Sequence, residues 1–461
     1  MQWEEKLRSI GAGAVVDKGV SVKYDGIRLP RFISEFLLSE FMIRYGDQEE
    51  AIKRMSEFID NNIPQPGHAS QWHNRLRLGE RCELIDSVRV AVHMEQLETE
   101  PMVSIPSIGL RKTRIDSALL DANPRLLREG IWGKATLEAR NGMVWLVDLK
   151  PFQVSDVSID GFMEIRKNFT RDEWAEILVS TIGLSPLNFS DHRKQLILIS
   201  RLLPLVQSQT FLIELGPPGT GKTFVLDKLS TRSFVISGSK ISPAQLFYDI
   251  RAKTEGLLRQ YSALLLDEVD KVHDKELSEE VVNKLLKYME SGTFDRGGLE
   301  FQSDTSLIMV GNLPQGFRSG GPVIQTLPNK FTHEAFLDRI NGILPGWELS
   351  AVMHSSSSLT KTWGFSADYF SEVLEHLRQL DWVPELRHRI SFDGCSIRDE
   401  KSIMRTVAGL CKLMYPDRVI TDENLQSILV FSLEIRQTLL DESALLHHSR
   451  TRHISATVRQ T

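Results

Sequence analysis

The sequence predicts an α/β P-loop core with a helical lid, preceded by a mixed α+β N-terminal domain that contains a small β-rich unit. An apolar strand at 211–215 runs directly into a glycine-rich loop, and strands and helices then alternate to about residue 345. After residue 365 only helical periodicity remains. These observations divide the 461 residues into an N-terminal domain at 1–165, an α/β core at 166–348, a helical lid at 349–445 and a polar tail at 446–461.

Composition and charge indicate a soluble globular protein rather than a membrane protein. Hydrophobic residues make up 41% and charged residues 25% of the chain, the balance of a soluble globular protein. No apolar run approaches the roughly 20 residues that cross a bilayer, and the amino terminus lacks a signal pattern, so we expect a cytoplasmic protein with no membrane partner. Cys82, Cys395 and Cys411 lack zinc-type spacing, which favours buried or idle thiols. Because the net charge is −6, nucleic-acid binding would need a local basic patch.

The N-terminal domain mixes helices and strands. Apolar residues at 33–43 recur at helical spacing, and a second helix is expected at 50–61. Residues 130–139 and 143–149 have the composition of strands, and the Asn-Gly pair at 141–142 is a hairpin turn signal. We therefore expect a hairpin within a β-rich unit.

Two helices are expected at the start of the core. Thr170 can cap the first one while Glu173 reaches back to it, and apolar residues then fall on one face as far as Ile182. A further helix at 193–206 leads to the strand at 211–215.

The glycine-rich loop matches the pattern G-x-x-x-x-G-K-[ST]. It consists of Gly216, Pro217, Pro218, Gly219, Thr220, Gly221, Lys222 and Thr223. Its glycines let backbone N–H groups approach phosphates, Lys222 can reach the β- and γ-phosphates, and Thr223 can ligate magnesium. The loop therefore predicts binding of ATP with Mg²⁺.

A second apolar strand, at 261–266, ends in two carboxylates, Asp267 and Glu268. We expect Asp267 to hold magnesium and Glu268 to polarise the attacking water. A strand ending in Asp-Glu is weak evidence alone, because acidic residues often begin surface loops. Its place after the phosphate loop strengthens the prediction.

A polar amide follows the next buried strand. After a helix at 278–290 and a hairpin at 292–302, the strand at 305–311 ends at Asn312, whose side chain could orient the water. A helix-capping role for Asn312 is the alternative.

Two arginines complete the constellation. The segment Phe-Leu-Asp-Arg-Ile at 336–340 resembles the one that presents an arginine finger in ring-forming AAA+ ATPases, which makes Arg339 the candidate finger. A surface ion pair with Asp338 or another acid is the alternative. Ser396 to Asp399 form a second capping box, which puts Arg398 in the first turn of a lid helix, where it can contact nucleotide from the same or an adjacent subunit.

The order of these motifs along the chain is that of an AAA+ ATPase. Because an arginine finger acts on the neighbouring subunit's ATP, the order also implies a homo-oligomeric ring, most simply a hexamer.

Several stretches resemble one particular family of AAA+ proteins. They are residues 29–38, 166–174, 215–223, 335–340, 344–348 and 396–399. They resemble the BrxL family, the Lon-like AAA+ proteins of BREX phage-defence systems, whose motor is similar to that of MCM helicases. The resemblance implies an N-terminal DNA-binding domain, stacked hexamers that form a dodecamer around double-stranded DNA, and partners among other BREX proteins. Full-length family members continue into a Lon-protease-like domain. This chain ends at Thr461 without a candidate Ser–Lys pair, so proteolysis is not expected.

Basic clusters supply the candidate DNA contacts. They are Arg75, Arg77, Arg81, Arg111, Lys112, Arg114 and, on the hairpin that points into the channel of MCM-like motors, Arg296. Solvated loops and a plain surface hairpin are the alternatives.

The leading hypothesis is an ATP-hydrolysing ring that acts on double-stranded DNA in phage defence, with translocation as one mode of action. The alternatives are a protein-remodelling motor that works with a separate protease or complex, and a nucleotide-gated scaffold with negligible turnover.

Overall fold

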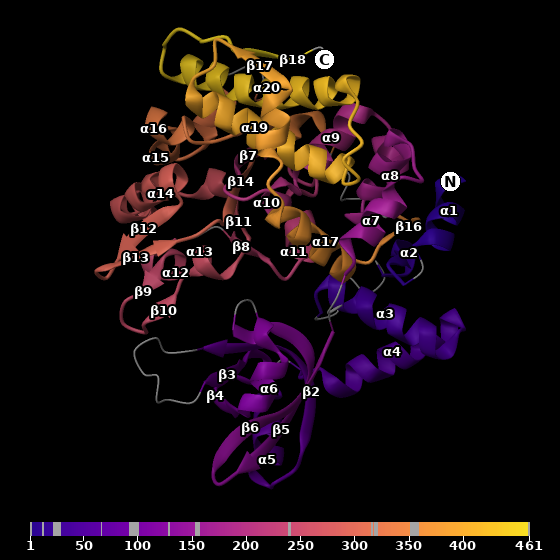
Figure 1. Ribbon diagram of the computed structural model, residues 1–461. Helices are drawn as coiled ribbons and strands as arrows, with labels where there is room; N and C mark the ends of the chain where they lie inside the picture. The colour runs from indigo at the N-terminus through magenta and orange to yellow at the C-terminus, as the bar shows by residue number, and fades with distance from the viewer. Residues whose placement is uncertain are drawn as a thin grey trace.

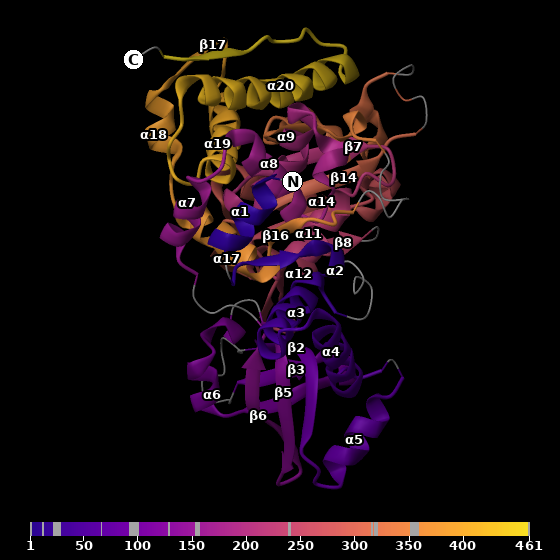
Figure 2. The same ribbon diagram turned by 90° about the vertical axis from the view of Figure 1, so that its right-hand side faces the viewer.

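The computed structural model describes residues 2–459 apart from 12, 22–28, 66, 92–100, 128–129, 153–156, 238–240, 315–316, 318–320 and 351–358. A β-rich part lies at one end of the molecule and a larger α/β part at the other (Figures 1 and 2). Helices α3 (Arg31–Tyr45) and α4 (Gln48–Asn62) lie between them, at the positions expected from their apolar spacing.

The β-rich part is a closed barrel with the strand order β2-β3-β4-β6-β5. Its strands are β2 (Cys82–Ala91), β3 (Met102–Ile105), β4 (Leu110–Ile115), β5 (Ile131–Arg140) and β6 (Met143–Pro151). β4 and β6 are parallel, and the other neighbours are antiparallel. Counted along the barrel, the order first-second-third-fifth-fourth is that of the five-stranded Greek-key barrel called the OB-fold.

Local turn chemistry and two short helices complete the barrel. The predicted hairpin is present between β5 and β6, because Asn141 and Gly142 both adopt the positive φ that a tight two-residue turn requires. Helix α6 (Ser117–Ala122) connects β4 towards β5, and α5 (Ala69–Arg77) packs against the barrel through Leu76.

The first residues of the chain pack with the α/β part. Helix α1 (Gln2–Ile10) buries Trp3 and Leu7, and β1 (Val15–Asp17) pairs with β16 (Trp363–Phe365), which follows the core in sequence. Helix α2 (Lys18–Ser21) comes next. No local pattern in the sequence reveals this pairing between distant segments.

The helices that lead to the first strand of the central sheet differ from the prediction. Helix α7 (Ile159–Arg166) precedes α8 (Arg171–Thr181), which has the expected capping box between Thr170 and Glu173. The single helix expected at 193–206 is wrong. The structure has α9 (His192–Ser200) and α10 (Leu203–Val206), because Pro204 has no N–H to donate to the preceding turn.

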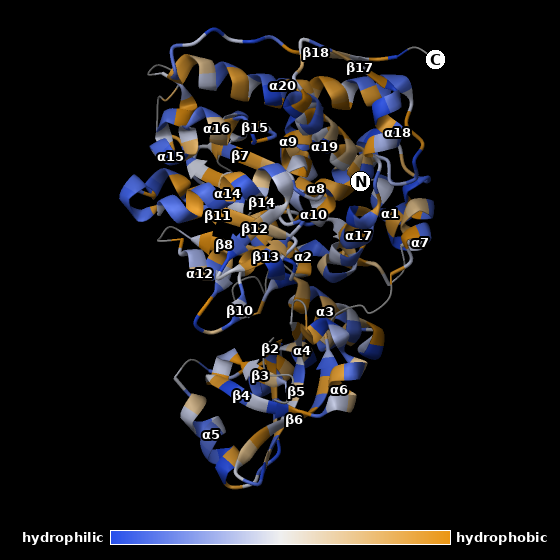
Figure 3. Cartoon of the chain, turned by 60° about the vertical axis from the view of Figure 1, so that its left-hand side comes forward, coloured by the Kyte–Doolittle hydropathy of each residue, from blue (hydrophilic) through white to orange (hydrophobic). Residues whose placement is uncertain are grey.

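The α/β part is built on a five-stranded parallel sheet with the order β15-β7-β14-β11-β8. These strands are β7 (Phe211–Gly216), β8 (Ser233–Ser237), β11 (Ala263–Asp267), β14 (Ser306–Asn312) and β15 (Gly342–Pro345). Alternate residues of each strand enter two different buried clusters, as a sheet covered on both faces requires. Much of these central strands is coloured orange, for hydrophobic residues, in Figure 3.

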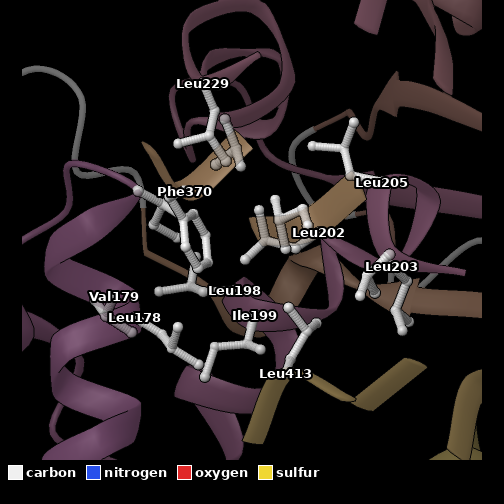
Figure 4. Close-up of a cluster of buried hydrophobic side chains, with 14 of the residues drawn as sticks. Leu178, Val179, Leu198, Ile199, Leu202, Leu203, Leu205, Leu229, Phe370 and Leu413 are labelled. Atoms are coloured by element: carbon white, nitrogen blue, oxygen red, sulfur yellow. The ribbon is translucent and has the colours of Figure 1, made fainter. Parts of the chain in front are cut away.

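Helices cover both faces of the sheet. Helices α8, α9, α10, α11 (Lys222–Leu229) and α17 (Ala367–Gln379) share a buried cluster with one face, and Figure 4 shows part of that cluster, including Leu198, Leu202 and Phe370. The other face meets α14 (Glu279–Ser291), whose N-cap is Ser278. The expected hairpin follows α14 as β12 (Thr293–Arg296) and β13 (Leu299–Gln302). Small elements on this side are α12 (Pro243–Leu246), β9 (Tyr248–Asp249), β10 (Thr254–Glu255), α13 (Leu257–Gln260), α15 (Asn329–Thr332) and α16 (Glu334–Leu337).

The lid contains α18 (Val383–His388), α19 (Ile397–Met414) and α20 (Asp422–Leu446). The capping box of Ser396 and Asp399 at the start of α19 is present as expected. The expectation of helices alone after residue 365 is wrong, because β17 (Ile390–Asp393) pairs with β18 (Ser455–Val458), which follows α20 in the chain. Both strands are too short to give a periodic signal of their own. Over the described residues, no helix has both the length and the apolar character needed to cross a bilayer.

Candidate nucleotide site

The carboxyl ends of three parallel strands meet at one edge of the central sheet. β14 lies between β7 and β11, so the loop after β7, Asn312 at the end of β14 and Asp267 at the end of β11 become neighbours. Together with Glu268 and residues 218–224, they line a cavity of about 280 Å³. The topology of the sheet thus assembles motifs that are far apart in sequence.

The backbone of the phosphate loop depends on its glycines. Gly219 and Gly221 have φ values of 79° and 74°, in the left-handed region that side chains disfavour. A Cβ on Gly216 would lie 2.5 Å from the carbonyl carbon of Gly346, so only glycine fits there. Such a loop at the start of α11 presents backbone N–H groups to an anion.

Lys222 is held over the loop by three acceptors. Its Nζ donates to the carbonyl oxygens of Gly216 at 3.1 Å and Pro217 at 2.8 Å, and to Oδ1 of Asn312 at 3.0 Å. Burial lowers the pKa of Lys222 below its ordinary value, and the nearby carboxylate of Glu214 opposes that shift. The ammonium group is therefore desolvated. When phosphate binds, its oxygens can replace the carbonyl oxygens as hydrogen-bond acceptors.

The predicted magnesium ligands are in direct contact. Thr223 Oγ1 donates to Asp267 Oδ2 at 2.8 Å. Hydroxyl and carboxylate oxygens are the donors that Mg²⁺ prefers, so Thr223 and Asp267 fit the ion and would hold it. When bound, Mg²⁺ would neutralise the charge of the phosphates.

Glu268 and Asn312 each have a neighbour that the sequence did not indicate. Glu268 has a φ of 53°, a left-handed conformation that costs free energy in a non-glycine residue, and its carboxylate pairs with Lys271. Asp270 Oδ1 accepts the backbone N–H of Asn312 at 2.8 Å. The side chain of Asn312 accepts from Lys222 and so faces the loop.

A buried ion pair between Arg201 and Glu214 contacts the backbone of the phosphate loop. Arg201 donates to both carboxylate oxygens of Glu214, with a shortest distance of 2.6 Å, and to the carbonyl oxygen of Thr220 at 3.1 Å. Both side chains are almost fully buried. The sequence pattern did not predict this pair, although a glutamate inside the apolar run of 211–215 is a visible signal of a buried charge.

Arg339 and Arg398 lie at the opposite edge of the sheet. Asn341, two residues after Arg339, accepts from and donates to the backbone of Phe211, the first residue of β7. A strand of that length spans roughly 17–20 Å, so Arg339 is remote from the loop at the other end of β7. Arg398 is next to Arg339, because both pair with Glu290.

Residues 144–453 match the family described as the ATPase domain of the Lon-like protease BrxL-like proteins, and residues 10–139 match the BrxL N-terminal domain of the BREX system Lon protease-like proteins. The chain belongs to the BrxL family. It therefore contains the ATPase domain of that family, in agreement with the phosphate loop and acid pair.

Two curated BrxL relatives are similar over nearly the whole chain. The Lon-like protease BrxL of Escherichia coli O9:H4 is 27% identical over 444 residues, which are 94% of this chain and 63% of that protein. The BrxL of Bacillus cereus H3081.97 is 26% identical over 452 residues, 95% of this chain and 66% of that protein. Among solved structures, a full-length MCM homolog from Methanopyrus kandleri aligns with a TM-score of 0.45 and 13% identity, over 80% of this chain and 79% of that one.

The candidate DNA contacts of this BrxL-family chain fall into three groups. On and after α5, Arg75 pairs with Glu80 at 2.8 Å, Arg77 donates to Asn74 at 3.0 Å, and Arg81 lies 3.6 Å from Glu138. All three arginines are exposed.

The second group is on β4 of the barrel, where Arg111 and Lys112 are exposed. The guanidinium of Arg114 lies 5.8 Å from the ring centroid of Trp145 on the neighbouring strand β6. Arg296, the third candidate, turns back to donate to the carbonyl oxygen of Tyr248 at 2.7 Å and to pair with Glu280. Its side chain is therefore engaged within its own subunit.

Proposed function

We propose that the chain forms a homo-oligomeric AAA+ ring that hydrolyses ATP and acts on double-stranded DNA in BREX-type phage defence. The observation that supports a ring is that the predicted catalytic residues lie in two groups, at opposite ends of the strands of the central sheet. Lys222 and Asp267 lie at the carboxyl edge of the sheet, whereas Arg339 and Arg398 lie at the amino edge, roughly 17–20 Å away along β7. A second copy of the chain is needed to bring the two halves together.

In the assembled site, the residues divide the chemistry of hydrolysis. The loop and Lys222 bind the phosphates, and Thr223 and Asp267 hold magnesium. Glu268 accepts a proton from the attacking water, and Asn312 orients that water molecule. The arginines of the neighbour stabilise the charge that develops on the γ-phosphate.

DNA as the substrate is supported by the family and by the barrel. Five-stranded barrels of this order commonly bind nucleic acids on the face of their second and third strands, here β3 and β4. That face presents Lys112 and Arg114, with Trp145 beside Arg114. Basic side chains next to an aromatic ring suit a sugar–phosphate backbone and its bases.

The test compares ATP hydrolysis with and without double-stranded DNA, together with duplex binding at moderate salt. We expect binding and a several-fold stimulation of turnover. Absence of both would remove DNA from the proposal and leave the ATPase intact.

A paired set of variants tests the barrel face. The double variant Lys112→Ala and Arg114→Ala should weaken duplex binding and reduce the slope of log affinity against log salt by about 2, because two phosphate contacts are lost. The matched control is Lys53→Ala and Arg54→Ala, which removes two exposed cations from α4. Equal losses in both double variants would argue for a nonspecific effect of charge.

The name of the curated relatives, Lon-like protease, favours a second candidate function, in which the ring unfolds polypeptides for a protease. Under that candidate, a tagged unfolded protein stimulates hydrolysis and duplex DNA has no effect. The same ATPase assay therefore separates the two functions.

A further inference from the structure

Glu290 occupies an unfavourable position in its helix. It lies in the last turn of α14, which ends at Ser291, and that turn contains no basic residue. The carboxyl end of a helix carries partial negative charge, so an acidic side chain there is destabilising unless other groups compensate it. Two arginines from distant parts of the chain supply that compensation.

The two arginines share a single oxygen atom of Glu290. Oε2 lies 2.7 Å from Nη2 of Arg398 and 3.1 Å from Nη2 of Arg339. Arg398 also pairs with Asp338 through its other terminal nitrogen, and Nη1 of Arg339 donates to the carbonyl oxygen of Ala335. The buried Nε of Arg339 has no hydrogen-bond acceptor within the described residues. Among the described residues, Glu290 is therefore the only carboxylate that pairs with both arginines.

The segments that carry these arginines are anchored by another arginine, Arg436 of α20. Its fully buried guanidinium donates to the carbonyl oxygen of Asp338 at 3.2 Å, to that of Ile340, and to Asp399 at 3.0 Å. Asp399 belongs to the first turn of α19, next to Arg398. The backbones on both sides are therefore fixed, and only the side-chain directions of Arg339 and Arg398 depend on Glu290.

We propose that Glu290 is a positioning residue that holds Arg339 and Arg398 together as one pair for the ATP bound by the neighbouring subunit. This inference rests on the proposed function, because it assumes hydrolysis across a subunit interface. Two guanidinium groups repel each other when they converge, and a shared carboxylate offsets that repulsion. The arginines then meet the γ-phosphate already oriented, which lowers the cost of organising the site.

The first experiment measures steady-state ATP hydrolysis by Glu290→Gln, which keeps the shape of the side chain and removes its charge. We expect kcat to fall about tenfold while KM for ATP stays within about twofold, because the phosphate loop lies at the other edge of the sheet. Glu290→Asp should recover part of kcat. The matched control is Glu279→Gln in the first turn of the same helix, which loses an exposed pair with Lys330 and should hydrolyse at the native rate.

The second experiment mixes Glu290→Gln subunits with Lys222→Ala subunits. A Lys222→Ala subunit cannot hold nucleotide but retains Glu290 and both arginines, so it should restore turnover at the intact phosphate loop of a Glu290→Gln neighbour. A purely structural effect of Glu290 on its own subunit would not be rescued in this way.

Native kcat in Glu290→Gln, or a defect that mixing does not rescue, would overturn the role of Glu290. Arg339→Ala, assayed in parallel, tests the proposed function separately. If Arg339→Ala turns over at the native rate, hydrolysis does not use this edge of the neighbour.

Discussion

At the nucleotide site, Lys222 and Glu268 are placed for different steps, the binding of phosphate and the hydrolysis of ATP. Lys222 is desolvated and bonded to the oxygens of Gly216, Pro217 and Asn312, where it can contact phosphate directly. Glu268 stands on a strained backbone beside Asp267, with Lys271 as its partner. We therefore expect Lys222 to control nucleotide binding and Glu268 to control turnover.

Two substitutions separate these roles. Lys222→Ala should abolish nucleotide binding, measured by titration with a fluorescent ATP analogue. Glu268→Gln should bind the analogue normally and lose about 10²–10⁴-fold in kcat, because an amide cannot accept the proton. A Glu268→Gln chain that retains both turnover and function would instead indicate a nucleotide-gated scaffold or another base.

At the scale of elements, the contacts between α9, β7 and the phosphate loop decide how firmly the loop is held. The pair formed by Arg201 and Glu214 joins the region after α9 to β7, and its bond to Thr220 extends into the loop. Removing one partner of such a pair leaves a buried, uncompensated charge.

Arg201→Met should lower the free energy of unfolding by about 3–5 kcal/mol, since Glu214 is left without its partner. Urea denaturation measures the loss, and Arg54→Met, which breaks an exposed pair on α4, should change stability by about 0.5 kcal/mol or less. A loss in Arg201→Met as small as the control would mean that the pair contributes no specific support.

A buried carboxyl group in the first turn of α17, that of Asp368, should make the stability of the fold depend on pH. Burial raises the pKa of Asp368 to about 6, above its ordinary value of 3.8. Between these values the folded chain keeps a proton that the unfolded chain has released, so this group's contribution to stability falls as pH rises to about 6 and is constant above it.

Asp368→Asn should remove that dependence. Relative to the native chain, the variant should gain about 2–3 kcal/mol between about pH 4 and pH 6, and no more at higher pH. Thermal unfolding across this range measures the difference, with the exposed Asp60→Asn as control. An equal change in both variants would show that Asp368 is not the group responsible.

Strand ends and helix caps explain which parts of the fold could be predicted. The phosphate loop, Asp267 and Asn312 were visible in sequence because each follows a buried strand, and the parallel sheet then brings them together. The capping boxes at Thr170 and Ser396 are local and were also visible. The pairing of β1 with β16, and of β17 with β18, depends on tertiary contacts between distant segments and left no local pattern. For the same reason, nothing in the sequence placed Glu290 beside two arginines.

For the whole molecule, the two edges of the sheet define two faces that a neighbouring copy would bring together. One edge carries Lys222, Thr223 and Asp267, and the other carries Arg339 and Arg398. A ring of identical subunits repeats this contact at every interface and leaves no half-site unused. Figure 2 shows the barrel at one end of the chain, so such a ring would carry one barrel on each subunit.

The most direct test of this account mixes two inactive variants, Lys222→Ala and Arg339→Ala, and measures ATP hydrolysis. Each alone should be inactive, because one lacks a phosphate-binding lysine and the other lacks the finger. An equimolar mixture should regain about a quarter of the native rate per chain, since random assembly forms that share of interfaces with a complete site. A mixture no more active than its separate components would contradict a nucleotide site completed by the neighbouring subunit.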